Sequence, residues 1–244
     1  MYGLACYAWQ VRGGAAQFSL PRFRRGAFWL FLLPCVLSMV FADRPWGTIL
    51  ALSPGALQHG QGLWQPLTAN FVYLEGELGG LIGTLFVQWF VGSTLEGFWG
   101  TRRYVLLVVG AGFVGYLVAA LFGAFVPDIA SVVMSGATPM DLAAIVAFGV
   151  VYGKQPVHLF GIAPLSARGL AVLIAVLSVI APLGRGTPWP HVVPWSVAML
   201  VALVATTQPW RKRGASGKLG RKAYANGTGK TQLRVVQLDR RRPN

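Results

Sequence analysis

The sequence predicts an all-α membrane protein with six transmembrane helices and an interfacial loop after the first helix. Three observations lead to this prediction. The 244 residues are 55% hydrophobic and only 11% charged, whereas soluble domains carry about 25% charged residues. Apolar runs on the scale of a bilayer recur along the chain. Lysine and arginine fall almost entirely into alternate connecting segments.

The six apolar segments are the candidate helices. A hydrocarbon core about 30 Å thick requires ~20 residues of helix, and several segments are shorter than this, so their boundaries are approximate. The six segments cover residues 27–42, 78–93, 104–126, 136–153, 168–183 and 192–207.

The charge distribution supports this number of spans independently. Lysine and arginine are retained on the cytoplasmic side of short loops. With a cytoplasmic N-terminus, only Arg44 and Arg185 of the 21 basic residues fall on the outer side. The basic N-terminal and C-terminal segments require an even number of spans, so we predict a multi-pass protein with both termini in the cytoplasm. RFRRG before the first span and VFA at 40–42 also fit a signal peptide. A retained helix is simpler, because five spans follow it.

The predicted organisation is therefore a basic cytoplasmic segment at 1–26, a membrane domain at 27–210 and a tail at 211–244. The tail is polar, Gly-rich and basic, with Asp239 as its one acid, which predicts disorder and contact with anionic lipid. No nucleic-acid partner is expected, because the basic residues do not alternate with a folded aromatic platform. The two cysteines, Cys6 and Cys35, indicate no metal site, and no cofactor is expected.

About thirty-five residues separate the first and second spans, too many and too apolar for a simple solvent loop. They include Trp46, Trp64, Phe71 and Tyr73, which are residue types suited to the headgroup level. We therefore predict a partly embedded interfacial element. Small residues also recur at a spacing of four within the spans, which allows helices to approach closely in lipid. These pairs are Gly79 with Gly83, Ala111 with Gly115, Ala143 with Ala147, and Ala198 with Ala202.

Four segments between residues 27 and 210 resemble the rhomboid superfamily of intramembrane serine proteases and their inactive relatives, including derlins. WQPLT at 64–68, with Trp64, is similar to the entry to the family's second helix. FVGSTLEGFWGTRRY at 90–104 is similar to the segment leading into the third. SGA at 135–137 and LFGIAPLSARGLAVL at 159–173 complete the resemblance. The match in LEGFWGTRR is the most specific, and its residues imply a structural role. They are Leu95, Glu96, Gly100 and Arg103.

The resemblance implies a Ser–His dyad, in which a base activates a hydroxyl that is otherwise a poor nucleophile. Ser135 lies at the start of the fourth span and His191 near the start of the sixth, both on the predicted outer side. His158 falls on the cytoplasmic side and His59 in the loop. Ser135 and His191 are therefore the candidate catalytic residues.

The sequence departs from the family pattern around this pair. Val133 replaces a glycine two residues before the serine. The histidine and asparagine that support the family's oxyanion fall on Gly80 and Thr84, and loss of one such donor typically slows catalysis ~100- to 1,000-fold. The family's catalytic histidine falls near Val193, about 200° around a helix from His191. Pro194 is able to shift that register.

Asp141 is an acid six residues after Ser135 and within a span, where carboxylates are costly. We interpret it as hydrated or hydrogen-bonded to a neighbouring helix; the alternative is an acid that polarises a substrate cavity.

The leading hypothesis is a rhomboid-like protein that engages transmembrane segments of other membrane proteins, with proteolysis weakened or lost. The alternative is an active intramembrane serine protease using Ser135 and His191, so whether the protein is an enzyme stays open at this point. A transporter has thin support, because the two halves lack matching interrupted helices.

Overall fold

The computed structural model describes residues 22–41, 45–74, 78–159, 163–184 and 189–207. The chain divides into two compact units, Met1–Thr206 and Thr207–Asn244, and the apolar helices belong to the first. The predicted tail at 211–244 lies outside the described residues, as do most of the N-terminal segment, Arg44 and Arg185.

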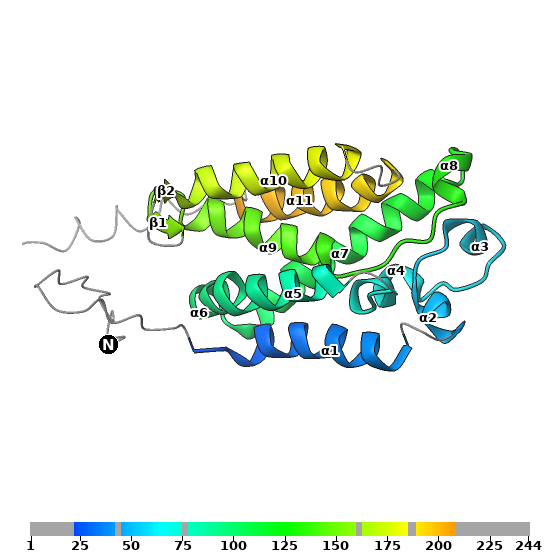
Figure 1. The fold of residues 1–244 in the computed structure, drawn as a ribbon, viewed down its shortest axis with the longest axis horizontal. Coiled ribbons are helices and arrows are strands. Elements are labelled where there is room, and N and C mark those ends of the chain that lie inside the picture. Colours follow the sequence, from blue (N-terminus) through cyan, green and yellow to red (C-terminus); the bar gives the residue numbers. More distant parts are fainter. Residues whose placement is uncertain (1–21, 42–44, 75–77, 160–162, 185–188, 208–244) are drawn as a thin grey trace, which may run out of the picture. The chain divides into compact units, whose positions relative to one another are not determined.

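Helices occupy all six of the predicted apolar segments (Figure 1). Two of them are long and apolar enough to cross a membrane, Thr101–Gly123 with 23 residues and Trp189–Thr207 with 19. The helices of the predicted spans are α1 (Arg25–Phe41), α5 (Leu78–Phe86) continuing through the π-helix η2 (Val87–Gly92) into α6 (Ser93–Trp99), α7 (Thr101–Gly123), α9 (Thr138–Val151), α10 (Ala167–Gly184) and α11 (Val192–Thr207).

The predicted interfacial loop folds into short helices at one end of the bundle. These are α2 (Pro45–Leu50), α3 (Pro54–Gln58), α4 (Gln65–Thr68) and the 3-10 turn η1 (Ala69–Phe71). They gather near α8 (Pro127–Ala130), which follows α7 (Figure 1). An antiparallel bridge between Leu52 and Met134 joins the loop to the segment before α9. The loop and the Ser135 segment are therefore one structural assembly.

A short hairpin departs from the all-α prediction. β1 (Pro156–Leu159) pairs antiparallel with β2 (Ala163–Ser166), in a register that aligns Pro156 with Ser166. Both strands contain a proline, which has no N–H for a helical hydrogen bond, so the connection between α9 and α10 is extended.

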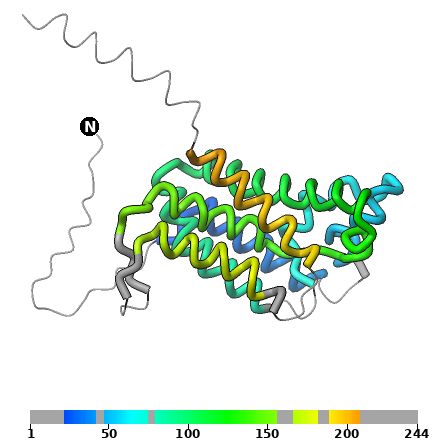
Figure 2. Tube along the Cα trace, turned by 90° about the horizontal axis from the view of Figure 1, so that it is seen from above, coloured from blue at the N-terminus to red at the C-terminus, as the bar shows by residue number. Residues whose placement is uncertain are grey.

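Small residues bring α7, α9 and α11 together at the centre of the bundle. Ala111 on α7, Ala143 on α9, and Ala198 and Ala202 on α11 form one buried cluster (Figure 2, α11 in orange). A side chain at Gly115 would collide with the Pro194 carbonyl at 2.5 Å. The spacing of these small residues predicted the close approach, and van der Waals packing between such surfaces is what associates helices in lipid.

Gly79 and Gly83 on α5 behave differently from the other small pairs. A Cβ added at either position would meet nothing within 4 Å. Ile82 and Phe86 on the same helix are 57% and 55% exposed. Among the described residues, this face of α5 is therefore largely uncovered, apart from the stacking of Phe86 on Phe90 in the next turn of the same span.

Candidate functional site

Ser135 lies in an extended segment three residues before α9, and it is half-buried. Its neighbours are held on both sides. The Met134 N–H donates to the Leu52 carbonyl at 2.8 Å, and the Gly136 N–H donates to the Ala69 carbonyl at 2.9 Å. The Tyr116 hydroxyl donates to the Gly136 carbonyl at 2.8 Å. Gly136 has φ +101°, a conformation that favours glycine, so the backbone at Ser135 is fixed by the loop and by α7.

The ring of Tyr73 fills the space beside this segment. A Cβ at Gly136 would lie 2.7 Å from the ring, and a Cβ at Gly80 would lie 2.5 Å from it. Tyr73 is only 4% exposed, so its ring contacts the protein interior and is not displayed on the surface of the loop. The two glycines leave room for a large ring to pack between α5 and the Ser135 segment.

The position of Gly80 bears directly on catalysis. The resemblance places an oxyanion-supporting histidine there, and the structure places the Tyr73 ring against it. Thr84, at the position of the family's asparagine, is fully buried. Its hydroxyl bonds to the Tyr73 hydroxyl at 2.7 Å. At Gly80, the Tyr73 ring therefore lies where the resemblance places a histidine. At Thr84, the hydroxyl that replaces the family's asparagine is engaged in an internal hydrogen bond.

His191 ends the 3-10 turn η3 (Trp189–His191), directly before α11. It is half-buried, and its imidazole makes no hydrogen bond with any residue that the structure describes. Val193 packs against the buried cluster that contains Met134 and Tyr116. The side chain that α11 turns toward the segment holding Ser135 is thus a valine, at the position where the family register places its histidine.

A chain of hydrogen bonds centred on Asp141 crosses the buried interior. The Asp141 carboxylate accepts from the Thr84 hydroxyl at 2.6 Å and from the Gln88 amide at 2.9 Å. Because Thr84 donates to Asp141, Tyr73 is the donor in its bond to Thr84. At the other end, the Tyr104 hydroxyl donates to the Gln88 side-chain oxygen at 2.6 Å. We call Tyr73, Thr84, Gln88, Tyr104 and Asp141 the polar chain.

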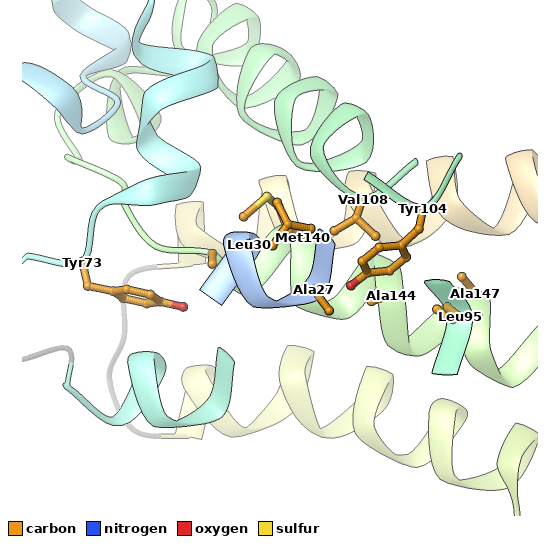
Figure 3. Close-up of a cluster of buried hydrophobic side chains, with 10 residues drawn as sticks. Ala27, Leu30, Tyr73, Leu95, Tyr104, Val108, Met140, Ala144 and Ala147 are labelled. Atoms are coloured by element: carbon orange, nitrogen blue, oxygen red, sulfur yellow. The ribbon is translucent and has the colours of Figure 1, made fainter. Parts of the chain in front are cut away.

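The polar chain ties together separate parts of the fold. Tyr73 comes from the loop, Thr84 from α5, Tyr104 from α7 and Asp141 from α9, while Gln88 lies in η2. Figure 3 shows the Tyr73 and Tyr104 hydroxyls pointing toward the interior from opposite sides of the cluster. Burial raises the pKa of the Tyr73 hydroxyl well above its usual value, so it remains a donor. Each of these five side chains has a hydrogen-bond partner, as a low-dielectric interior requires.

The π-helical turn explains how Gln88 reaches both partners. A π turn widens the helix by one residue, and here the Ser93 hydroxyl also donates to the Gln88 backbone carbonyl at 3.3 Å. Gly92 lies against the Tyr104 hydroxyl, and any side chain there would displace it. Gln88 was not among the predicted site residues, although Thr84 and Gln88 are polar residues four apart in an apolar span, which places them on one helix face.

This arrangement is suited to holding helices together. The parts of the chain that the structure describes contain no cluster of three or more His, Cys, Asp or Glu residues able to hold a metal ion. Asp141 is 6% exposed, and both carboxylate oxygens accept hydrogen bonds from neighbouring helical segments.

Glu96 forms a second buried site at the opposite end of the bundle. Its carboxylate accepts from the Gly26 N–H at 3.1 Å, the Ala27 N–H at 2.9 Å and the Thr101 hydroxyl at 2.6 Å. The first N–H groups of a helix lack partners within the helix and carry a partial positive charge. Glu96 therefore caps α1 from another part of the chain.

The other predicted motif residues have unequal roles. Leu95 is fully buried in the main hydrophobic cluster, and Gly100 adopts φ +80° between α6 and α7. Arg103 is exposed. Trp64 is 54% exposed, with its indole N–H 3.3 Å from the Ile49 carbonyl. Its segment forms α4 inside the loop between the first and second predicted spans, where the sequence placed it.

Gln65 and Thr68 anchor the WQPLT segment more closely than Trp64 does. The Gln65 side chain accepts from the Ser53 N–H at 3.0 Å and donates to the Ile49 carbonyl at 3.3 Å. The Thr68 hydroxyl donates to the Leu50 carbonyl at 2.7 Å. These bonds satisfy backbone groups that the short helices of the loop leave open.

Comparison with known protein families finds a match over most of the chain. The family described as "Eukaryotic integral membrane protein (DUF1751)" matches residues 25–204. This range extends from the first residue of α1 into the last turns of α11. No curated protein matches the chain.

Proposed function

Because the chain belongs to this family of eukaryotic integral membrane proteins, we propose that it is a rhomboid-like, multi-pass protein that engages transmembrane segments of other membrane proteins without cleaving them. One observation carries the second half of this proposal. The Tyr73 ring is wedged between Gly80 and Gly136, beside Ser135. A peptide carbonyl attacked by Ser135 would need hydrogen-bond donors for its oxyanion. The resemblance places such a donor at position 80, and here the Tyr73 ring lies against that position.

The orientation that we propose places both termini in the cytoplasm. The lysines and arginines that the structure describes follow or precede helix ends at α1, at the α6–α7 junction and at the hairpin between α9 and α10. They are Arg22, Arg24, Arg25, Arg102, Arg103, Lys154 and Arg168. The Ser135 segment and the loop helices lie at the other end. Retention of basic residues on the cytoplasmic side supports this orientation.

The open face of α5 is the surface that we assign to a client helix. Gly79 and Gly83 would let a second backbone approach closely, which is how transmembrane helices gain contact in lipid. The exposed side chains of Ile82 and Phe86 flank this stripe. The stripe lies on the helix that also carries Thr84, so α5 faces the polar chain on one side and is open on the other.

The first test asks whether Ser135 is a nucleophile. We expect no labelling of the purified full-length protein by a fluorophosphonate probe, because the Tyr73 ring fills the adjoining space and His191 supplies no hydrogen bond. An active rhomboid protease in the same detergent provides the positive control, and a thermal melt confirms the fold. Labelling that disappears in both Ser135→Ala and His191→Ala would instead establish the alternative, an active serine protease.

The second test concerns the α5 face. We expect a photoreactive residue in place of Phe86 to crosslink to transmembrane peptides of other proteins in native membranes. Gly83→Ile should reduce this several-fold, because the added side chain prevents the close backbone approach that associates helices in lipid.

Two matched controls distinguish this face from general exposure to lipid. Gly110 on α7 also has nothing within 4 Å of an added Cβ, and Gly110→Ile should leave the crosslinks unchanged. Leu106, 65% exposed on α7, provides the control position for the photoreactive residue. Equal crosslinking from positions 86 and 106 would contradict a docking role for α5.

A further inference from the structure

A groove of about 520 Å³ opens between α9, α10 and α11, away from the polar chain and the Ser135 segment. Its lining is aliphatic or small, with Ser196 and Arg168 as the two polar residues. Arg168 lies at the first turn of α10, so the charge is at one end of the groove and the apolar lining extends inward from it.

The packing of the three helices explains why the groove exists. α10 lies tightly on α9, where a side chain at Gly149 would collide with Ala171. α11 instead packs on α7 and α9 through Ala198 and Ala202. On the α10 side, Met199 of α11 packs with the cluster that contains Ala171, and the remaining space between the helices is the groove. Ala175 and Leu203 line it.

Arg168 is available for a partner. It is exposed, and its guanidinium lies against Gly153, whose added Cβ would be 3.1 Å from the Arg168 Nε. The acids among the described residues lie elsewhere: Glu96 caps α1, Asp141 belongs to the polar chain and Asp128 is in α8. No carboxylate of the described chain pairs with Arg168.

We propose that this groove is a binding site for one anionic glycerophospholipid, with its phosphate on Arg168 and one acyl chain between α10 and α11. A basic residue at the membrane boundary and an apolar channel leading inward match the two halves of such a lipid. Basic pockets between transmembrane helices on the cytoplasmic side bind anionic headgroups, and we predict that Arg168 lies on that side.

The order of charge and apolar lining along the groove favours a lipid over a protein helix. Its one charge, on Arg168, lies at one end, and the rest of the lining is aliphatic or small apart from Ser196. A phosphate with an acyl chain below it matches this order over the seven residues of helix, or about 10 Å, from Arg168 to Ala175. This site is separate from the α5 face, so its failure would leave the proposed function untouched.

The test uses full-length protein in lipid nanodiscs containing a trace of phosphatidylserine or phosphatidylcholine with a diazirine in one acyl chain. We expect phosphatidylserine to label α10 and α11 peptides that line the groove about fivefold more than phosphatidylcholine, since one basic residue contributes about 1 kcal/mol of attraction. Arg168→Gln should remove this preference. Arg103→Gln, an exposed charge outside the groove, should leave it unchanged.

A second pair of variants tests the acyl-chain half of the site. Ala175→Phe should fill the groove and reduce labelling of its peptides by both lipids, while Leu177→Phe, at a position 52% exposed, should not. Melting temperatures show whether each variant folds. Equal labelling by the two lipids, equal effects of Arg168→Gln and Arg103→Gln, or crosslinking of these residues to a protein segment in native membranes would each overturn the proposal.

Discussion

Replacing Glu96 with alanine is expected to destabilise the protein by about 4–5 kcal/mol, the lower end of what three hydrogen bonds to a charged group contribute at about 1.5–3 kcal/mol each. The change removes three bonds at once, to the Gly26 and Ala27 N–H groups and to the Thr101 hydroxyl. It leaves the start of α1 uncapped in a buried position, since Glu96 is only 3% exposed. Unfolding in mixed detergent micelles, followed by tryptophan fluorescence, measures the loss.

Two variants separate the cap from a general loss of negative charge. Glu96→Gln keeps one carbonyl oxygen as an acceptor and should cost about half as much, since a neutral acceptor is weaker than a charged one. Asp128→Ala removes an acid from α8 at the other end of the bundle, where Asp128 is exposed. It should change stability by less than about 0.5 kcal/mol, as exposed substitutions usually do. An Asp128→Ala effect as large as that of Glu96→Ala would contradict the capping interpretation.

Replacing Asp141 with leucine is the second change with a large expected effect, about 3 kcal/mol. Leucine accepts no hydrogen bond, so the Thr84 hydroxyl and the Gln88 amide would lose their common acceptor inside the bundle. A buried donor without a partner costs about 1–3 kcal/mol. The same unfolding measurement applies, and we expect near-ultraviolet circular dichroism to report the loosening of Tyr73 and Tyr104 at the ends of the polar chain.

Asp141→Asn tests whether a neutral side chain with one oxygen acceptor is able to replace the carboxylate in the polar chain. Asparagine keeps one oxygen acceptor for Gln88, and its amide is able to donate to Thr84 if the Thr84 hydroxyl turns toward Tyr73. The cost should then be about 1 kcal/mol, near the average for interhelical hydrogen bonds in membranes. In a double-mutant cycle, Asp141→Leu and Gln88→Leu should be non-additive, because they remove the same bond. Strict additivity would show that the two side chains act independently.

Hydrophobicity predicted the helices well, because it depends on the local sequence. The apolar segments match α1, α5 with η2, α7, α9, α10 and α11 to within a few residues, except that the helix of the second span continues to Trp99. The spacing of Ala198 and Ala202 predicted a contact face on α11 that does pack. The same spacing at Gly79 and Gly83 does not pack in this chain, because the spacing shows only where a close approach is possible.

The candidate site was predictable only in part. Glu96 was identified as structural from the LEGFWGTRR segment, and its three partners account for that role. Asp141 was identified because an acid is conspicuous in an apolar span. The burial of Tyr73 within the protein was not predicted, because a tyrosine in an aromatic-rich loop carries no local sign of it. Its position follows from two distant glycines, Gly80 and Gly136, which together leave a ring-sized space.

By itself, the sequence determined that this is a helical membrane protein, where its apolar helices lie and which polar residues within them need partners. These properties follow from the transfer of each side chain between water and lipid, which depends on residue type and local spacing. Only the tertiary structure decided which partners those residues find, that the Tyr73 ring lies against Gly136 in the Ser135 segment, and that Ala198 and Ala202 of α11 pack on α7 and α9. These arrangements depend on the shapes of surfaces far apart in the sequence, and close packing permits only the combinations in which those shapes fit.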